Sequence, residues 1–97
     1  MFVVIARFYA QAGKDDEVAA ALRDMTPFAN TEPGCACYIV NRALDDPREF
    51  VLYEQYHDRA GFDAHLATPE FKEHILGRVV PLLESRGRQF YEVIGPA

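Results

Sequence analysis

The sequence predicts an α+β fold in which helices cover one face of a four-stranded antiparallel sheet. Segments rich in β-branched and aromatic residues occur at positions 2–10, 35–42, 50–57 and 89–94, as is typical of strands. Between the first two segments, and again between the last two, apolar residues recur at the helical spacing of three to four. The order is strand, helix, strand, strand, helix pair, strand, which is the ferredoxin-like arrangement.

The first strand is expected over Phe2 to Ala10. One of its faces is wholly apolar, and the other is apolar until Arg7, which therefore either lines a pocket or reaches the rim of the sheet. After a glycine-containing turn, three acidic residues from Asp15 open the first helix, where they suit its positive N-terminal end. Pro27 removes a helical hydrogen bond, so a kink or break is expected near Thr26.

The second and third strands, 35–42 and 50–57, are expected to form an antiparallel hairpin, because Asp45-Asp46-Pro47 between them is a turn signal. Cys35 and Cys37 should point to the same face of a regular strand. A disulfide between them would distort the pleat, so two small buried thiols are the interpretation.

The segment between the third and fourth strands holds a short helix and a longer one. Asp58 is the expected cap of the short helix, and Thr68 followed by proline is the expected start of the long one, which should run from Pro69 to Ser85 with a kink at Pro81. Phe62, His65 and Leu66 fall on one face of the short helix. A single histidine is thus expected on its inward face.

Length and charge limit the function. A chain of 97 residues predicts one domain, residues 1–97. Its net charge of -5, with few clustered basic residues, argues against a nucleic-acid binder. The chain shows no membrane-length apolar run and no signal-peptide pattern, so a cytoplasmic location and no membrane partner are expected. The second face of the sheet still carries large apolar side chains, which predicts a homodimer with packed sheets.

The known catalytic and metal-binding motifs are missing, and neither a metal nor a cofactor is expected. The three histidines do not have metal-site spacing, no G-x-S-x-G occurs, and the glycines are isolated. Several polar residues remain among apolar ones. Glu54 needs a partner, for which Arg7 is a candidate, although a structural ion pair or rim charge is the alternative.

The tyrosines and His65 are each open to two interpretations. Tyr53 and Tyr56 are either hydrogen-bond donors to a bound carbonyl or core residues. His65 is either a general base near neutral pH or a core histidine. His74 lies one residue off the apolar stripe of the last helix, at its border.

The chain resembles the antibiotic biosynthesis monooxygenase family of small dimeric α+β barrels. The matching pieces span nearly the whole sequence in order. They are Gly13-Lys14 before an acidic helix start, Glu32-Pro33-Gly34-Cys35, Asp46-Pro47 before Phe50-Val51-Leu52-Tyr53-Glu54, and Ala64-His65-Leu66-Ala67-Thr68-Pro69 followed by Phe71. The resemblance implies a homodimer with a pocket between sheet and helices in each subunit.

Several members of that family oxidise quinols or polyketide phenols with molecular oxygen and without metal, flavin or haem. The resemblance implies the same for this chain: a small aromatic substrate, with His65 as the base and Arg7 or Tyr53 stabilising a developing oxyanion. The remaining candidates are substrate-binding residues, namely Glu54, Tyr56, Phe62, Phe71 and His74. Glu70 stands where some members carry a second histidine, which weakens any mechanism that needs both.

Three rival interpretations remain. Haem-degrading relatives use an Asn, a Trp and a His where this chain has Arg7, His65 and Ile75, so haem degradation is not expected. A relative that isomerises a phosphorylated autoinducer shares the Tyr-Glu and His pattern, but a phosphate needs more local positive charge than the sequence shows. A ligand-binding or accessory dimer without catalysis is the third.

Overall fold

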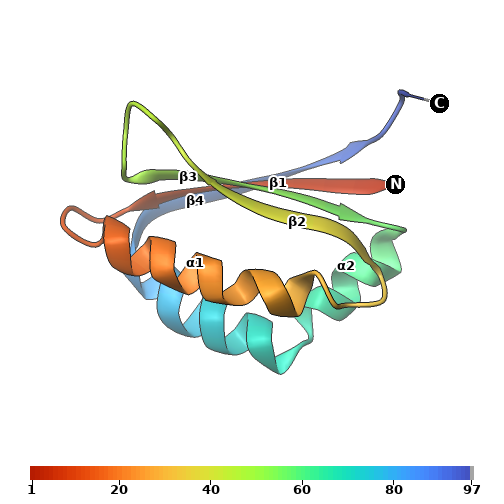
Figure 1. The fold of residues 1–97 in the computed structure, drawn as a ribbon, viewed down its shortest axis with the longest axis horizontal. Helices are drawn as coiled ribbons and strands as arrows, with labels where there is room; N and C mark the ends of the chain where they lie inside the picture. Colours follow the sequence, from red (N-terminus) through yellow and green to blue (C-terminus); the bar gives the residue numbers. More distant parts are fainter. Residues whose placement is uncertain (97) are drawn as a thin grey trace.

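The computed structural model describes residues 1–96 of the chain. A four-stranded antiparallel sheet in the order β2-β3-β1-β4 carries all the helices on one face (Figure 1). The predicted ferredoxin-like α+β class is confirmed. In chain order the elements are β1 (Phe2–Ala10), α1 (Asp15–Ala29), β2 (Cys35–Arg42), β3 (Glu49–Tyr56), α2 (Arg59–Leu66), the π-helix η1 (Phe71–Val79), the 3-10 turn η2 (Val80–Leu82) and β4 (Leu83–Glu92).

The core lies between the sheet and two long helical segments, α1 and η1, which run side by side below it (Figure 1). Val18, Leu22 and Met25 of α1 form the predicted apolar stripe and are fully buried there. A smaller cluster centred on Val4, Tyr56 and Phe62 lies under α2 at one end of the sheet. The two clusters together fill the layer between the sheet and the helices that cover one of its faces. Of the helices in residues 1–96, none is long and apolar enough to cross a membrane.

Of the kink or break expected near Thr26, the break does not occur, because α1 continues through Pro27 to Ala29. A proline has no N–H, so the carbonyl of Arg23, one turn earlier, loses its helical donor. The hydroxyl of Thr26 donates to that carbonyl at 2.7 Å and replaces the missing bond. The sequence contained this compensation in the residue that precedes the proline.

The expectation that Cys35 and Cys37 share one face is also wrong. Strand β2 has a bulge between them, so that Cys35 is paired with Tyr56 and Cys37 with Gln55. The inserted residue shifts the alternation by one position. Cys35 consequently packs into the core beneath the helices, whereas Cys37 lies on the outer face, and Tyr38 becomes an inward residue.

The last helix ends earlier than expected and the last strand begins earlier. Helical structure stops at Leu82, and β4 starts at Leu83, where the sequence favoured a helix to Ser85 and a strand only from position 89. Pro81 sits in the terminal 3-10 turn. Strand β4 is an edge strand whose residues are mostly exposed. Because it is exposed on both faces, it lacks the alternation by which a half-buried strand is recognised.

Helix α2 sits directly against the turn that precedes β2, because two glycines meet there. A Cβ at Gly34 would lie 2.6 Å from the Cα of Gly61, and one at Gly61 would lie 2.8 Å from the carbonyl oxygen of Gly34. Only glycine permits this backbone approach. The predicted cap is confirmed at the same end, where the Asp58 carboxylate accepts from the N–H of Gly61 at 2.9 Å.

The outer face of the sheet has no helix over it (Figure 1). The side chains on this face include Ile39, which is 51% exposed, and Tyr91, which is 42% exposed. Arg7 and Tyr53 also belong to it, since they alternate with the inward Ala6, Leu52 and Glu54.

Candidate functional site

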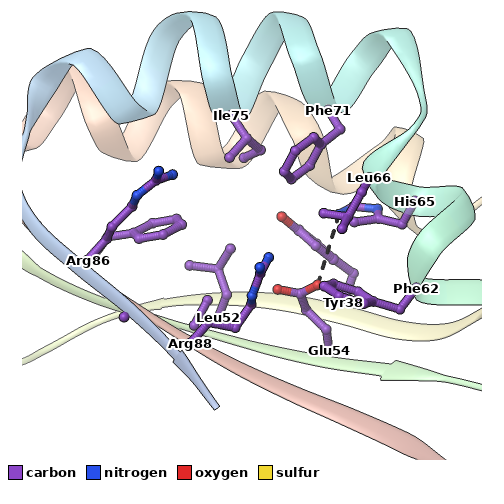
Figure 2. Close-up of a pocket in the computed structure, with 13 residues that line it drawn as sticks. Tyr38, Leu52, Glu54, Phe62, His65, Leu66, Phe71, Ile75, Arg86 and Arg88 are labelled. Atoms are coloured by element: carbon purple, nitrogen blue, oxygen red, sulfur yellow. Dashed lines mark ion pairs between the residues drawn. The ribbon is translucent and has the colours of Figure 1, made fainter. Parts of the chain in front are cut away.

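A cavity of about 270 Å³ lies between the inner face of the sheet and the helices α2 and η1 (Figure 2). This volume is near the lower end of small-molecule sites, which span roughly 300–1,000 Å³. Apolar side chains from both layers make up most of the wall, among them Leu52, Phe62, Phe71 and Ile75. The polar groups at the cavity are Tyr38, Glu54, His65, Arg86 and Arg88.

His65 projects from α2 at one end of the cavity, and it is only 2% exposed. Its Nδ1 is 2.9 and 3.0 Å from the two carboxylate oxygens of Glu32. Glu32 is in the turn before β2, so the contact between Gly34 and Gly61 is what brings the carboxylate to the imidazole. The other ring nitrogen, Nε2, is 4.0 Å from Oε1 of Glu54 (dashed line in Figure 2).

The hydroxyl of Thr68 fixes the backbone around His65. It donates to the His65 carbonyl at 2.9 Å and accepts from the N–H of Phe71 at 3.1 Å. This is the helix cap that the sequence predicted at Thr68. One side chain thereby links the end of α2, which carries the imidazole, to the start of η1, which places the Phe71 ring 5.1 Å from it.

Glu54 projects from β3 into the cavity, and it is 4% exposed. Its carboxylate accepts a hydrogen bond of 2.6 Å from the hydroxyl of Tyr56. The expected pairing of Glu54 with Arg7 is wrong, because Arg7 is paired in register with Val51 and points to the outer face. The positive group near Glu54 is instead Arg88 of β4.

Burial moves the titratable groups of the site toward their uncharged forms. It raises the pKa of Glu32 to about 7, with a further contribution from the nearby carboxylate of Glu70. It also raises the pKa of Glu54 to about 7, although the Tyr56 hydrogen bond and the charge of Arg88 oppose the shift. The pKa of His65 falls to about 4, first through burial and then through the charge of Arg88. The imidazole is therefore neutral at physiological pH.

The protonation of Glu32 decides which nitrogen of His65 can act as a base. When Glu32 is ionised, Nδ1–H donates to its carboxylate, and Nε2 presents a lone pair toward the cavity. When Glu32 is protonated, its hydroxyl donates to Nδ1, and the proton of the neutral ring is on Nε2. The tautomer of His65 with a free lone pair on Nε2 therefore predominates above about pH 7, where Glu32 is ionised.

Sequence reasoning missed three polar residues of the cavity. The hydroxyl of Tyr38 points into the cavity (Figure 2). Arg86 and Arg88 enter from β4, where they are paired in register with Phe8 and Ala6. The bulge in β2 and the early start of β4 hid these orientations, although the sequence did show that the two arginines are close together.

The other candidates are distributed as follows. His65, Glu54, Phe62 and Phe71 line the cavity. Tyr56 is fully buried behind Glu54. His74 is between η1 and α1, where it accepts from Arg78 at 2.9 Å and stacks on Phe28, so it does not line the cavity.

Arg7 and Tyr53 are also outside the cavity. They lie on the outer face of the sheet, where the Tyr53 hydroxyl accepts from Gln55 at 2.7 Å. The expectation that either stabilises an oxyanion in this cavity is wrong, because strand alternation turns both side chains away from it.

The arrangement can hold a small aromatic molecule against a neutral imidazole. Within residues 1–96, no three His, Cys, Asp or Glu side chains converge so that they could hold a metal ion. The groups in contact with the cavity can remove a proton at Nε2 of His65, donate a hydrogen bond from Tyr38, and balance a negative charge at Arg86 and Arg88.

Solved structures with this architecture include several close neighbours. An antibiotic biosynthesis monooxygenase superimposes with a TM-score of 0.90 at 25% identity, covering 98% of this chain and 100% of the other. Protein SO0527 of Shewanella oneidensis has a TM-score of 0.87 at 31% identity, covering 93% and 87% of the two chains. Rv0793 of Mycobacterium tuberculosis gives 0.89 at 27% identity, covering 99% and 97%.

Sequence comparisons agree with the structural ones. An uncharacterized protein of Synechocystis sp., sll1783, is 27% identical over 73 residues, which are 75% of this chain. The chain spans about half the length (50%) of this curated relative. The model of the family described as antibiotic biosynthesis monooxygenase matches residues 1–75, a range that holds both His65 and its partner Glu32. The chain therefore belongs to the antibiotic biosynthesis monooxygenase family.

Proposed function

We propose that this chain is a cofactor-independent monooxygenase that oxidises a quinol or a polyphenolic, polyketide-like aromatic compound with molecular oxygen. The observation that carries the proposal is the pair formed by the buried His65 and the partly buried Glu32, which holds a neutral imidazole with Nε2 toward the cavity. Membership of the family supports the same class of reaction.

In the proposed reaction, Nε2 of His65 takes the proton of a phenolic or enolic hydroxyl and leaves an electron-rich anion. The Glu32 carboxylate stabilises the resulting imidazolium through Nδ1–H. The hydroxyl of Tyr38 donates to the substrate oxygen as negative charge develops there.

The substrate anion then supplies the electrons that reduce oxygen. The substrate loses two hydrogens, one from its hydroxyl and one from the reacting ring carbon. That carbon gains one oxygen atom as a carbonyl, and the second oxygen atom leaves with the two hydrogens as water. Atoms and electrons balance without an external reductant. Leu52, Phe62 and Phe71 supply apolar surface against which the reacting ring packs.

Oxygen-electrode measurements with reduced naphthoquinones and anthrone-like phenols test the proposal. We expect uptake above the uncatalysed rate, and a loss of about two orders of magnitude in His65→Gln, which is near the low end for a general base. His74→Gln is the matched control, because His74 is buried outside the cavity. No uptake with any compound of the panel would favour a ligand-binding or accessory protein without catalysis.

An isomerase of the phosphorylated-autoinducer type is the second candidate. The sequence argued against it because local positive charge was not evident. Arg86 and Arg88 both line the cavity, which supplies such charge. Conversion of a phosphorylated dione without oxygen uptake would favour this reaction.

A further inference from the structure

Two arginines of β4 face the cavity, and the proposed proton transfer does not use them. Arg86 and Arg88 are alternate residues of an antiparallel strand, paired in register with Phe8 and Ala6. Side chains two residues apart point to the same face, about 7 Å from each other along the strand. Both guanidinium groups therefore belong to the inner face of the sheet (Figure 2).

Neither guanidinium has a carboxylate within 4.0 Å among residues 1–96, unlike most of the other arginines. Arg42, Arg48, Arg59 and Arg78 each lie within that distance of an Asp or Glu. Arg88 instead lies over the rings of Phe62 and Phe90, at 5.2 and 5.6 Å from their centroids. An arginine stacked on aromatic rings keeps the edge of its donor fork free for a planar oxyanion.

The nearby carboxyl does not cancel this charge. Burial raises the pKa of Glu54 to about 7, so close to neutral pH a large fraction of its carboxyl is protonated. Although the whole chain carries a net charge of -5, the lining of the cavity includes two positive side chains, both exposed to solvent, and at most one negative one. The cavity is thus an electropositive site on an acidic protein.

The polar side chains are spread along the cavity, and apolar side chains lie beside them. Figure 2 shows Arg86 at one end, His65 at the other, and the guanidinium of Arg88 between them beside Glu54. Leu52, Phe71 and Ile75 supply an apolar wall against which an aromatic ring fits, with an anionic substituent toward the arginines and a hydroxyl toward His65.

We propose that the substrate carries an anionic oxygen group, a carboxylate or a phosphate, which Arg86 and Arg88 bind while its ring packs against the apolar wall. The placing of the reacting hydroxyl at His65 rests on the proposed function, whereas the binding of the anion does not. Charge-assisted and bidentate hydrogen bonds to guanidinium groups supply both affinity and orientation.

Isothermal titration calorimetry with three compounds of the same ring system tests the proposal: a naphthol, the corresponding hydroxynaphthoate and the naphthyl phosphate. We expect at least one anion to bind about tenfold or more tightly than the naphthol, as charge-assisted hydrogen bonds predict. The difference in affinity between anion and naphthol should shrink as the salt concentration is raised, because salt screens the attraction between the anion and the exposed guanidinium groups. Equal affinity for the neutral and both anionic compounds overturns the proposal.

Variants locate the anion. Arg88→Gln and Arg86→Gln should each reduce the advantage of the anion and leave the affinity for the naphthol within about twofold. Arg23→Gln is the matched control, because Arg23 is exposed on α1 and does not line this cavity. Circular dichroism and thermal melting establish that the variants are folded. Should either glutamine variant not fold, Arg→Lys at the same position keeps the charge and removes the bidentate fork.

The outcomes separate the two proposals. Tighter binding of the hydroxynaphthoate or of the naphthyl phosphate shows whether the site takes a carboxylate or a phosphate. Anion binding that is lost in Arg88→Gln, without oxygen uptake by any phenol, supports this inference and contradicts the monooxygenase. Oxygen uptake that is equally fast with neutral and anionic phenols, and is unchanged in both arginine variants, supports the monooxygenase and overturns this inference.

Discussion

Replacement of Glu54 by glutamine should make the protein more stable at alkaline pH and little different at acid pH. Burial raises the pKa of this carboxyl from 4.5 to about 7 in the folded chain. Between these two values the folded state binds more protons than the unfolded state, so wild-type stability falls as pH rises. Above about pH 7 the whole loss is present. Glutamine has no such titration and can still accept the Tyr56 hydrogen bond.

The magnitude follows from the shift. A pKa difference of about 2.5, at 1.36 kcal/mol for each unit, amounts to about 3 kcal/mol. Part of this loss has already occurred at pH 5. The difference in free energy of unfolding between Glu54→Gln and wild type should therefore grow by about 2.5 kcal/mol between pH 5 and pH 8. His65 titrates in the opposite sense, because its lowered pKa of about 4 increases stability as pH rises toward 6.5. It is present in both proteins and cancels to first order.

Urea unfolding at a series of pH values, followed by circular dichroism, measures this difference. Glu49→Gln is the matched control, since Glu49 is exposed on the same strand. Its difference from wild type should not vary with pH by more than about 0.5 kcal/mol. If the Glu54→Gln difference is equally flat, the carboxyl is not held in a desolvated site, and the electrostatic description of the cavity is refuted.

Three further predictions concern the base, the glycine contact and the sheet face. Glu32→Gln should lower the oxygen-uptake rate about 10- to 100-fold, because a charge-assisted hydrogen bond is worth about 1.5–3 kcal/mol. The variant should also lose the rise in rate that ionisation of Glu32 causes near pH 7. An unchanged pH profile on the oxygen electrode contradicts the role of Glu32. Gly61→Ala should lower the free energy of unfolding in urea by about 1–3 kcal/mol, because the new Cβ meets the carbonyl oxygen of Gly34 at 2.8 Å. Gly87→Ala is the control and should lower it less, because a Cβ there has no atom within 4 Å. Equal losses in the two variants would mean that the backbone contact is not needed. Light scattering at micromolar concentration should give a homodimer that Ile39→Asp dissociates, because Ile39 is 51% exposed on the uncovered face; an 11.0 kDa wild-type species would contradict the dimer.

The local signals predicted the elements that bury one face. Strand β1, helix α1 and the hairpin of β2 and β3 were predicted from periodicity, and Asp58 and Thr68 from cap chemistry. Such patterns are legible in sequence because each depends on neighbours within a few residues. The same reasoning failed at Pro27, where the adjacent Thr26 hydroxyl replaced a lost hydrogen bond.

The candidate site was only partly predictable. His65, Glu54, Phe62 and Phe71 were identified because they share the inward faces of their elements, and the cavity contains all four. Arg7 and Tyr53 were misplaced, because a charged or polar residue on a strand does not reveal which face of the sheet the helices will cover. A one-residue bulge in β2 likewise reversed the side chains around it and turned Tyr38 inward.

By itself, the sequence determined the order of elements, the helix caps and an inward histidine, since these follow from local spacing. Only the tertiary structure decided what surrounds that histidine. The close approach of Gly34 and Gly61 brings Glu32 to Nδ1, and pairing across β1 brings Arg88 near Glu54. The two partners are 33 positions apart in the first case and 34 in the second. The pKa values of Glu32, Glu54 and His65 are shifted first by burial, and that burial exists only once the sheet and helices have closed over the cavity.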